Sequence, residues 1–208
     1  MSLFDTLIQG FDRSLKTLTG SYEAARPNPA ETHAEPDLSE VERTHSAGLM
    51  RVNHTGEVCA QALYEGQALT ARNPTARQAL TQAAEEERDH LEWCRTRVKE
   101  LGGRTSALDP LFFGASFVMG TVTGLFGDKV SLGFVEATED QVVLHLEKHL
   151  DELPSGDDRS RLIIEQMRDD EARHGNRARS MGGIEFPPAV KYGMSIVAKV
   201  MTETAYRV

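Results

Sequence analysis

The chain has 208 residues, with 23 Lys and Arg against 32 Asp and Glu, so its formal charge is −9. This length is sufficient for one hydrophobic core, and the absence of a long basic run argues against a nucleic-acid-binding surface, which depends on clustered Lys and Arg. Both cysteines lie in helical patterns and the N-terminus lacks the uninterrupted apolar stretch of a secretory signal, so we expect a location that faces the cytosol.

Residues 1–38 are predicted to form an N-terminal amphipathic helix followed by a linker. Apolar side chains recur at helical spacing over residues 1–20. The linker contains Pro27, Pro29 and Pro36, which disfavour a continuous helix. The predicted helix could dock on the rest of the chain, on a neighbouring subunit or on a membrane surface.

Residues 39–208 are predicted to be all-α, in a four-helix bundle with two additional apolar or amphipathic elements. Ser39 and Glu42 have the spacing of a capping box at the start of the first long helix. Glycine pairs follow the second and fourth helices, as expected beyond a helix C-terminus. The long helices are expected over about residues 39–72, 74–101, 129–153 and 157–181, and a last amphipathic helix over 188–206.

Charged residues interrupt the apolar stripes of all four long helices. Glu-x-x-His motifs lie on the stripes of the second and fourth, and single glutamates on those of the first and third. Carboxylates are costly to bury without partners, and side chains three residues apart on a helix can reach the same ion. The candidate metal ligands are therefore Glu57, Glu87, His90, Glu139, Glu171 and His174.

These six residues form a weak internal repeat, because each half of the chain has a helix with one Glu followed by a helix with Glu-x-x-His. Dinuclear carboxylate sites in ferritin-like bundles have this arrangement. Four carboxylates contribute about −4 and two ferrous ions about +4, so a buried site would be close to neutral. Oxygen-rich ligation without thiolate favours iron, with manganese as the second choice, over structural zinc. Activation of dioxygen is the chemistry expected of such a site.

The motifs that contain these residues resemble those of the demethoxyubiquinone hydroxylase family. They are RVNHTGE at 51–57, EERDH at 86–90, EATE at 136–139 and RDDEARH at 168–174, and the similarity covers roughly residues 40–208. The resemblance implies a membrane-associated di-iron monooxygenase that hydroxylates the ring of 2-polyprenyl-3-methyl-6-methoxy-1,4-benzoquinol in ubiquinone biosynthesis. It further implies one iron at Glu57, Glu87 and His90, another at Glu139, Glu171 and His174, and Glu87 and Glu171 as candidate bridges. Residues 1–38 are expected to lie outside the resemblance.

Residues 110–127 contain no charged side chain and approach the length of a membrane span. A single crossing would separate His90 from Glu139, and a proline and four glycines disfavour a continuous helix. We therefore expect an apolar hairpin or interfacial segment that admits a polyprenyl chain; a buried core helix or an oligomer interface is the alternative. The helix expected over 188–206 could lie on an anionic membrane leaflet.

Four further side chains near the candidate ligands allow two interpretations. His54 could be a ligand or an outer partner of one, and His145 could bond within the site or be an ordinary solvated histidine. Asp89 and Asp170 could accept the free N–H of a ligand histidine or be solvated charges. Tyr64 lies two turns beyond Glu57, so it is expected to be distant from the metals, which disfavours a radical-generating subunit.

The sequence leaves two function classes, a quinol hydroxylase and a non-enzymatic ferritin-like iron-binding or storage bundle. The uncharged segment at 110–127 favours the hydroxylase, which needs a polyprenyl benzoquinol, dioxygen and a membrane surface. No Gly-x-Gly-x-x-Gly turn for nicotinamide or flavin is present, so electrons would come from a separate reductase or from the quinol. Other ubiquinone-biosynthesis proteins and further copies of the chain are the remaining candidate partners. The expected location is peripheral, on the cytoplasmic face of the cell membrane.

Overall fold

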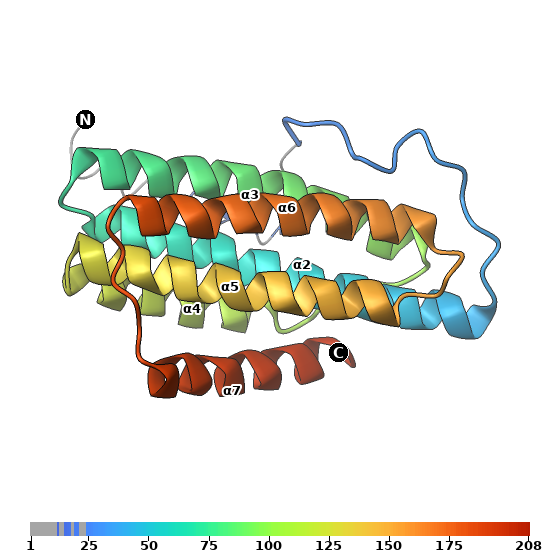
Figure 1. Cartoon of the computed structure of the whole chain (residues 1–208). Coiled ribbons are helices and arrows are strands. Elements are labelled where there is room, and N and C mark those ends of the chain that lie inside the picture. Colours follow the sequence, from blue (N-terminus) through green and yellow to red (C-terminus); the bar gives the residue numbers. More distant parts are fainter. Residues whose placement is uncertain (1–11, 13–14, 18, 21–23) are drawn as a thin grey trace.

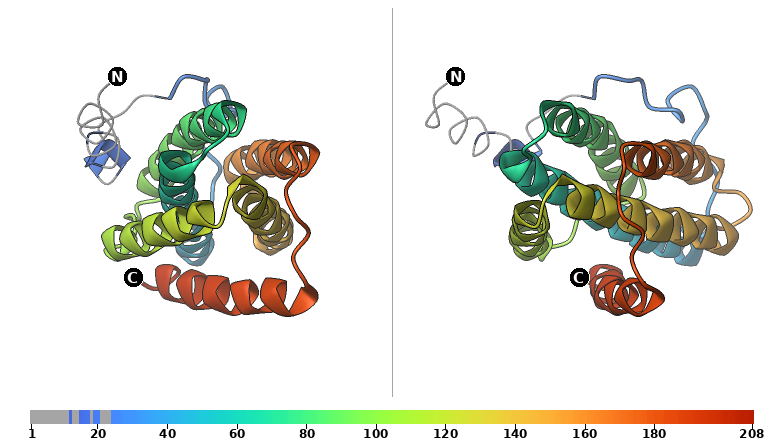
Figure 2. Two further views of the ribbon diagram at one scale, coloured as in Figure 1. Left: turned by 90° about the vertical axis from the view of Figure 1, so that its left-hand side faces the viewer. Right: turned by 60° about the vertical axis from the view of Figure 1, so that its left-hand side comes forward.

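The computed structural model describes residues 12, 15–17, 19–20 and 24–208, so most of the helix predicted over 1–20 lies outside the described residues. The described helices are α2 (Glu40–Thr70), α3 (Pro74–Glu100), α4 (Asp109–Leu125), α5 (Asp128–Glu152), α6 (Asp158–Ser180) and α7 (Pro188–Ala205). Four of them, α2, α3, α5 and α6, run side by side as a bundle, with α4 and α7 outside it (Figures 1 and 2). The described residues contain no strand, and the predicted all-α, ferritin-like bundle is confirmed.

The helix ends follow local capping chemistry. The Ser39 N–H donates to Glu42 Oε2 at 2.9 Å and the Glu42 N–H to Ser39 Oγ at 3.3 Å, which confirms the predicted capping box. Asn73 Oδ1 accepts the Thr75 N–H at 2.8 Å at the start of α3. Gly102 has a φ of 75°, which a residue with a side chain rarely adopts, and stands just beyond the C-terminus of that helix. These contacts define the start of α2 and both ends of α3.

The buried apolar residues form two main clusters at different levels of the bundle. One includes Met50, Trp93 and Ile163, and the other includes Leu80 and Leu132. On each bundle helix the polar residues of the stripe lie between these two levels. The clusters therefore exclude water from a central polar layer on both sides.

Helix α4 corrects the prediction of a hairpin over 110–127. It is one continuous helix that packs along α2, and its glycines are close-contact positions rather than helix breakers. A Cβ atom on Gly120 would lie 2.2 Å from the Leu63 carbonyl oxygen, and one on Gly66 would lie 2.4 Å from the Phe117 carbonyl oxygen. The absence of side chains at these positions lets the two backbones approach, and packing outweighs the weak helix propensity of glycine. No described helix combines the length and apolar character needed to cross a bilayer.

Gly120 and Gly114 give a matched test of this packing, because both lie on α4. Gly120→Ala should lower the free energy of unfolding by about 2 kcal/mol, since the added methyl group meets the α2 backbone. Gly114→Ala should be neutral or stabilising by up to about 1 kcal/mol, because nothing lies within 4 Å of its Cβ position. Urea titrations of both variants measure the difference. Equal stabilities would contradict a glycine-dependent contact between α2 and α4.

Candidate metal centre

All six predicted ligands are buried in the polar layer at the middle of the bundle. Each bundle helix contributes what its sequence stripe predicted: one glutamate each from α2 and α5, and a Glu-x-x-His pair each from α3 and α6. The pairs reach inward together because residues three apart share a helix face. The six residues are Glu57 on α2, Glu87 and His90 on α3, Glu139 on α5, and Glu171 and His174 on α6.

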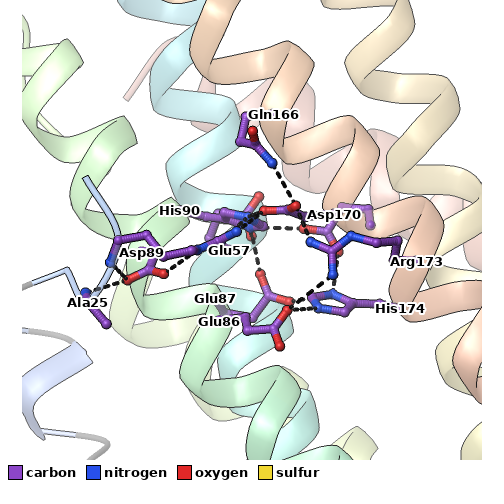
Figure 3. A network of polar contacts seen from close by, with 12 residues as sticks. Ala25, Glu57, Glu86, Glu87, Asp89, His90, Gln166, Asp170, Arg173 and His174 are labelled. Carbon is purple, nitrogen blue, oxygen red and sulfur yellow. Dashed lines mark hydrogen bonds and ion pairs between the residues drawn. The ribbon is translucent and has the colours of Figure 1, made fainter. Parts of the chain in front are cut away.

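Glu87 and Glu171 each contact both histidines. Figure 3 shows Glu87 together with His90 and His174. His90 Nδ1 is 3.1 Å from Glu87 Oε2 and 3.0 Å from Glu171 Oε1. His174 Nδ1 is 3.2 Å from Glu87 Oε1 and 3.0 Å from Glu171 Oε2. Each glutamate therefore presents one oxygen to each histidine, which is the placement needed to bridge two positions.

The two remaining glutamates are placed differently. Glu57 Oε2 lies 3.5 Å from His90 Nδ1, and Glu57, Glu87, His90 and Glu171 offer ligand atoms that all lie within 4.8 Å of one another. His174 is outside that tight group, and so is Glu139. Its Oε1 accepts a hydrogen bond of 2.5 Å from the Tyr64 hydroxyl, while its Oε2 has no hydrogen-bond partner.

The contact with Glu139 corrects the prediction that Tyr64 is distant from the site. Tyr64 is two turns from Glu57 along α2, but its hydroxyl reaches across to α5. Its ring also meets the His174 ring edge-on, with centroids 6.2 Å apart. The prediction failed because it considered only axial rise along one helix, whereas a long side chain spans the gap between neighbouring helices.

Burial and mutual repulsion shift the pKa values of the glutamates in the polar layer. Burial raises the pKa of the Glu57 carboxyl well above its usual value, and the charges of Glu87 and Glu171 raise it further. Burial raises the pKa of Glu139 in the same way, again with contributions from Glu171 and Glu87. The ionised forms of these carboxyls are therefore unfavourable unless positive charge is supplied.

Histidine supplies part of that positive charge. Burial alone would lower the pKa of His90 and His174, but the carboxylates around them outweigh it and raise the pKa of both. Burial would raise the pKa of Glu87, and hydrogen bonds from His174 and His90 lower it below its usual value instead.

The donor set fits a cationic centre. Glu139 Oε2 is a buried acceptor without a hydrogen-bond donor. Glu87 Oε1 and Glu171 Oε1 are buried beside one histidine Nδ1 each, at 3.2 and 3.0 Å. Such oxygens cost free energy unless a cation or another donor reaches them. A cluster of carboxylates and imidazoles without thiolate is suited to iron or manganese.

Two carboxylates outside the predicted ligand set accept the Nε2–H groups of His90 and His174. His90 Nε2 is 2.9 Å from Asp170 Oδ2, and His174 Nε2 is 2.9 Å from Glu86 Oε2. These contacts fix the ring orientation and leave both Nδ1 atoms facing the central glutamates. Asp170 is fully buried, so the interpretation of this residue as a solvated charge is wrong and the acceptor role is confirmed.

Glu86 was missed at the sequence level, although the repeat contains a signal for it. Glu86 directly precedes Glu87, just as Asp170 directly precedes Glu171. In each half of the chain, this outer acid contacts the histidine of the other half. The acidic pairs at 86–87 and 170–171 are thus the sequence signal for a carboxylate that contacts the histidine of the opposite half.

The other flanking residues have separate roles. Asp89 is buried but accepts from the Ala25 N–H at 2.7 Å, so it is neither solvated nor, in the described contacts, a partner of a ligand histidine. His54 Nδ1 lies 3.2 Å from Asp109 Oδ2, away from the tight ligand group. The His145 ring packs against His149, with centroids 3.9 Å apart.

Comparison with known proteins identifies the family. The model of the family described as "Ubiquinone biosynthesis protein COQ7" matches residues 44–205. The chain belongs to the COQ7 family. Curated relatives of this COQ7-family chain are named 3-demethoxyubiquinol 3-hydroxylase. The relative from Stutzerimonas stutzeri is 57% identical over 205 residues, covering 98% of this chain and 95% of its own length.

Two Pseudomonas proteins with the same printed name extend the comparison. The Pseudomonas fluorescens protein is 54% identical and the Pseudomonas aeruginosa protein 53% identical, each over 208 residues, covering 100% of this chain and 97% of the relative. The match to the family model begins at residue 44, as expected, whereas the alignments with these two relatives also cover residues 1–38. The motifs quoted for the resemblance all lie beyond residue 50, so the sequence patterns gave no signal for the earlier part.

Proposed function

We propose that this COQ7-family chain is a di-iron monooxygenase that hydroxylates the ring of 2-polyprenyl-3-methyl-6-methoxy-1,4-benzoquinol (demethoxyubiquinol) with dioxygen. The observation that carries the proposal is the placement of Glu87 and Glu171, each with one oxygen toward His90 and one toward His174. The names printed for the curated relatives support the same substrate.

Six side chains would hold the two irons. Glu57 and His90 would serve one position, Glu139 and His174 the other, and Glu87 and Glu171 would bridge them. Iron bound there supplies the redox chemistry with dioxygen, and manganese is the second candidate.

The residues around the ligands orient them. Asp170 and Glu86 hold the imidazole rings through Nε2, so Nδ1 is the nitrogen available to the centre. Tyr64 donates to one oxygen of Glu139 and leaves the other oxygen free. The apolar clusters on both sides keep water from competing with the quinol ring.

The outer helices would bring the chain to its lipid substrate. Figures 1 and 2 show α4 and α7 on the side of the bundle remote from α3 and α6. Exposed apolar side chains on these two helices include Leu111, Val118, Val122, Ile196 and Val197. We place this side against the cytoplasmic face of the cell membrane, with the protein peripheral to it. A separate reductase or the quinol would supply electrons, and other ubiquinone-biosynthesis proteins and further copies of the chain are candidate partners.

Charged substitutions on this side test the membrane proposal. Val118→Asp should lower co-sedimentation with anionic phosphatidylglycerol-containing liposomes roughly tenfold, because it removes apolar burial and adds a repelled charge. Val41→Asp is the control, since it adds the same charge at an exposed valine at the start of α2. Equal binding of the two variants would contradict membrane contact through α4.

Turnover tests the proposed activity. The iron-loaded protein, supplied with a reductant, dioxygen and a demethoxyubiquinol analogue, should yield a product with one added ring hydroxyl group. Iron oxidation that accumulates in the protein while the quinol stays unmodified would favour the alternative, a ferritin-like iron-binding or storage bundle.

A further inference from the structure

Residues 24–38, here called the N-terminal strap, pack against α3 and α6 before α2 begins. Figure 1 shows this strap as the blue segment that leads to the start of α2. Ala30 and Leu38 are buried in the same apolar cluster as Trp93. At its far end, Glu35 pairs with Arg97 at 2.8 Å and with Arg159 at 2.9 Å. The strap is therefore an ordered part of the fold rather than only a linker.

Arg26 of the strap connects two carboxylates from different bundle helices. Its Nε donates to Asp89 Oδ2 on α3 at 2.6 Å, and its Nη1 donates to Asp170 Oδ2 on α6 at 2.7 Å. The guanidinium also lies over the Trp93 ring, 4.9 Å from its centroid. The Ala25 N–H holds Asp89 Oδ1, so the backbone of the strap is fixed next to this arginine.

The oxygen of Asp170 that Arg26 contacts is the same oxygen that faces His90. His90 Nε2 lies 2.9 Å from Asp170 Oδ2, whereas Asp170 Oδ1 accepts from Gln166 and Arg173 of its own helix. Arg26 and His90 thus share this oxygen, so Arg26 helps to set where Oδ2 stands relative to the imidazole. The Nη2 atom of Arg26 also lies 3.4 Å from His90 Nε2 itself.

The other histidine lacks an equivalent support from the strap. Its acceptor, Glu86, is 23% exposed, and the Arg173 guanidinium lies 3.8 Å from it. Asp170, by contrast, is fully buried. The two halves of the centre have matching ligands but unequal outer contacts.

We propose that Arg26 is a positioning residue for the His90 half of the metal centre, acting through Asp170. This inference rests on the proposed metal-dependent function, because it assigns a role toward the bound ion. It predicts that the strap raises the affinity of one of the two metal positions, and that the His174 position depends on Glu86 instead.

Titration of the protein with Co²⁺ against a competing chelator tests the inference, with visible absorption reporting each binding event. Loss of an outer contact to a ligand histidine weakens metal binding about tenfold to a hundredfold. Arg26→Ala should therefore weaken one of the two dissociation constants by that factor and leave the other unchanged. Arg26→Met should give the same result, since it keeps an aliphatic stem over Trp93, and it carries the test if the alanine variant does not fold.

Two matched variants separate positioning from stability. Glu35→Ala cuts the other ion pairs of the strap and should leave both Co²⁺ constants unchanged. Glu86→Gln should weaken the constant that the Arg26 variants leave intact. Unchanged constants in the folded Arg26 variants, or an equal loss in Glu35→Ala, would overturn the inference. Failure of the unaltered chain to bind two Co²⁺ ions would instead contradict the proposed metal centre.

Discussion

Glu171→Ala should abolish stoichiometric binding of both iron ions, and with it quinol hydroxylation, while the helix content stays near that of the unaltered chain. Glu171 presents one oxygen toward His90 and the other toward His174, so its removal takes a ligand from both positions at once. It also removes one negative charge from a buried site whose neutrality depends on matching carboxylates and cations. Iron content after anaerobic reconstitution, with far-UV circular dichroism, measures the result.

Asp169→Ala is the control for this variant. Asp169 lies two residues away on the same helix, but its side chain is largely exposed and pairs with its neighbour Arg168. Iron content and activity should stay unchanged in this variant. Retention of two ions by Glu171→Ala would contradict the bridging assignment.

Asp157→Ala should lower the free energy of unfolding at neutral pH by about 3 kcal/mol, the cost of breaking a buried ion pair from one side. The side chains of Asp157 and Arg97 are fully buried, with Oδ1 and Nη2 2.8 Å apart. Asp157 also caps α6 by accepting the Ser160 N–H at 3.1 Å. Urea denaturation of both proteins measures the difference.

The stability difference should depend on pH. Burial tends to raise the pKa of Asp157, but hydrogen bonds from Ser160 and Ser46 and the charge of Arg97 outweigh it, so the pKa lies below its usual value. A lowered pKa stabilises the fold fully above the ordinary carboxyl pKa, and this contribution disappears as pH falls through the lowered value. The difference between the proteins should therefore shrink below about pH 4.

Glu35→Ala is the comparison variant, because it removes a different carboxylate from the same arginine, Arg97. Glu35 contacts Arg97 too, but its side chain is 38% exposed, so its loss should cost no more than about 1 kcal/mol. Equal losses of stability in the Asp157 and Glu35 variants would show that burial of the Asp157 pair is not what matters.

The periodicity of the sequence predicted the bundle and the residues at its centre. Apolar stripes at helical spacing fixed the four long helices, and the interruptions at Glu87 and Glu171 stood out because buried carboxylates are costly. Both signals are local, since each depends on residues within one helix. All six residues are buried, and ligand atoms of four of them lie within 4.8 Å of one another, while their role as metal ligands stays a prediction.

Contacts between distant segments were harder to predict from the sequence. The glycines of α4 favour a break when only helix propensity is considered, and their role appears only beside α2. Tyr64 reaches α5, Glu86 reaches α6, and Arg26 meets a carboxylate 144 residues away. No periodic pattern encodes such pairs, because each depends on which helices become neighbours.

The most direct test of the proposed function follows the origin of the new ring oxygen. The iron-loaded chain, a reductant and a demethoxyubiquinol analogue are incubated with isotopically labelled dioxygen in unlabelled water, and the quinol is analysed by mass spectrometry. We predict one labelled oxygen atom in the ring of the product, and no such product from Glu171→Ala. A hydroxylated product with unlabelled oxygen, or consumption of dioxygen with the quinol unchanged, would contradict a quinol monooxygenase.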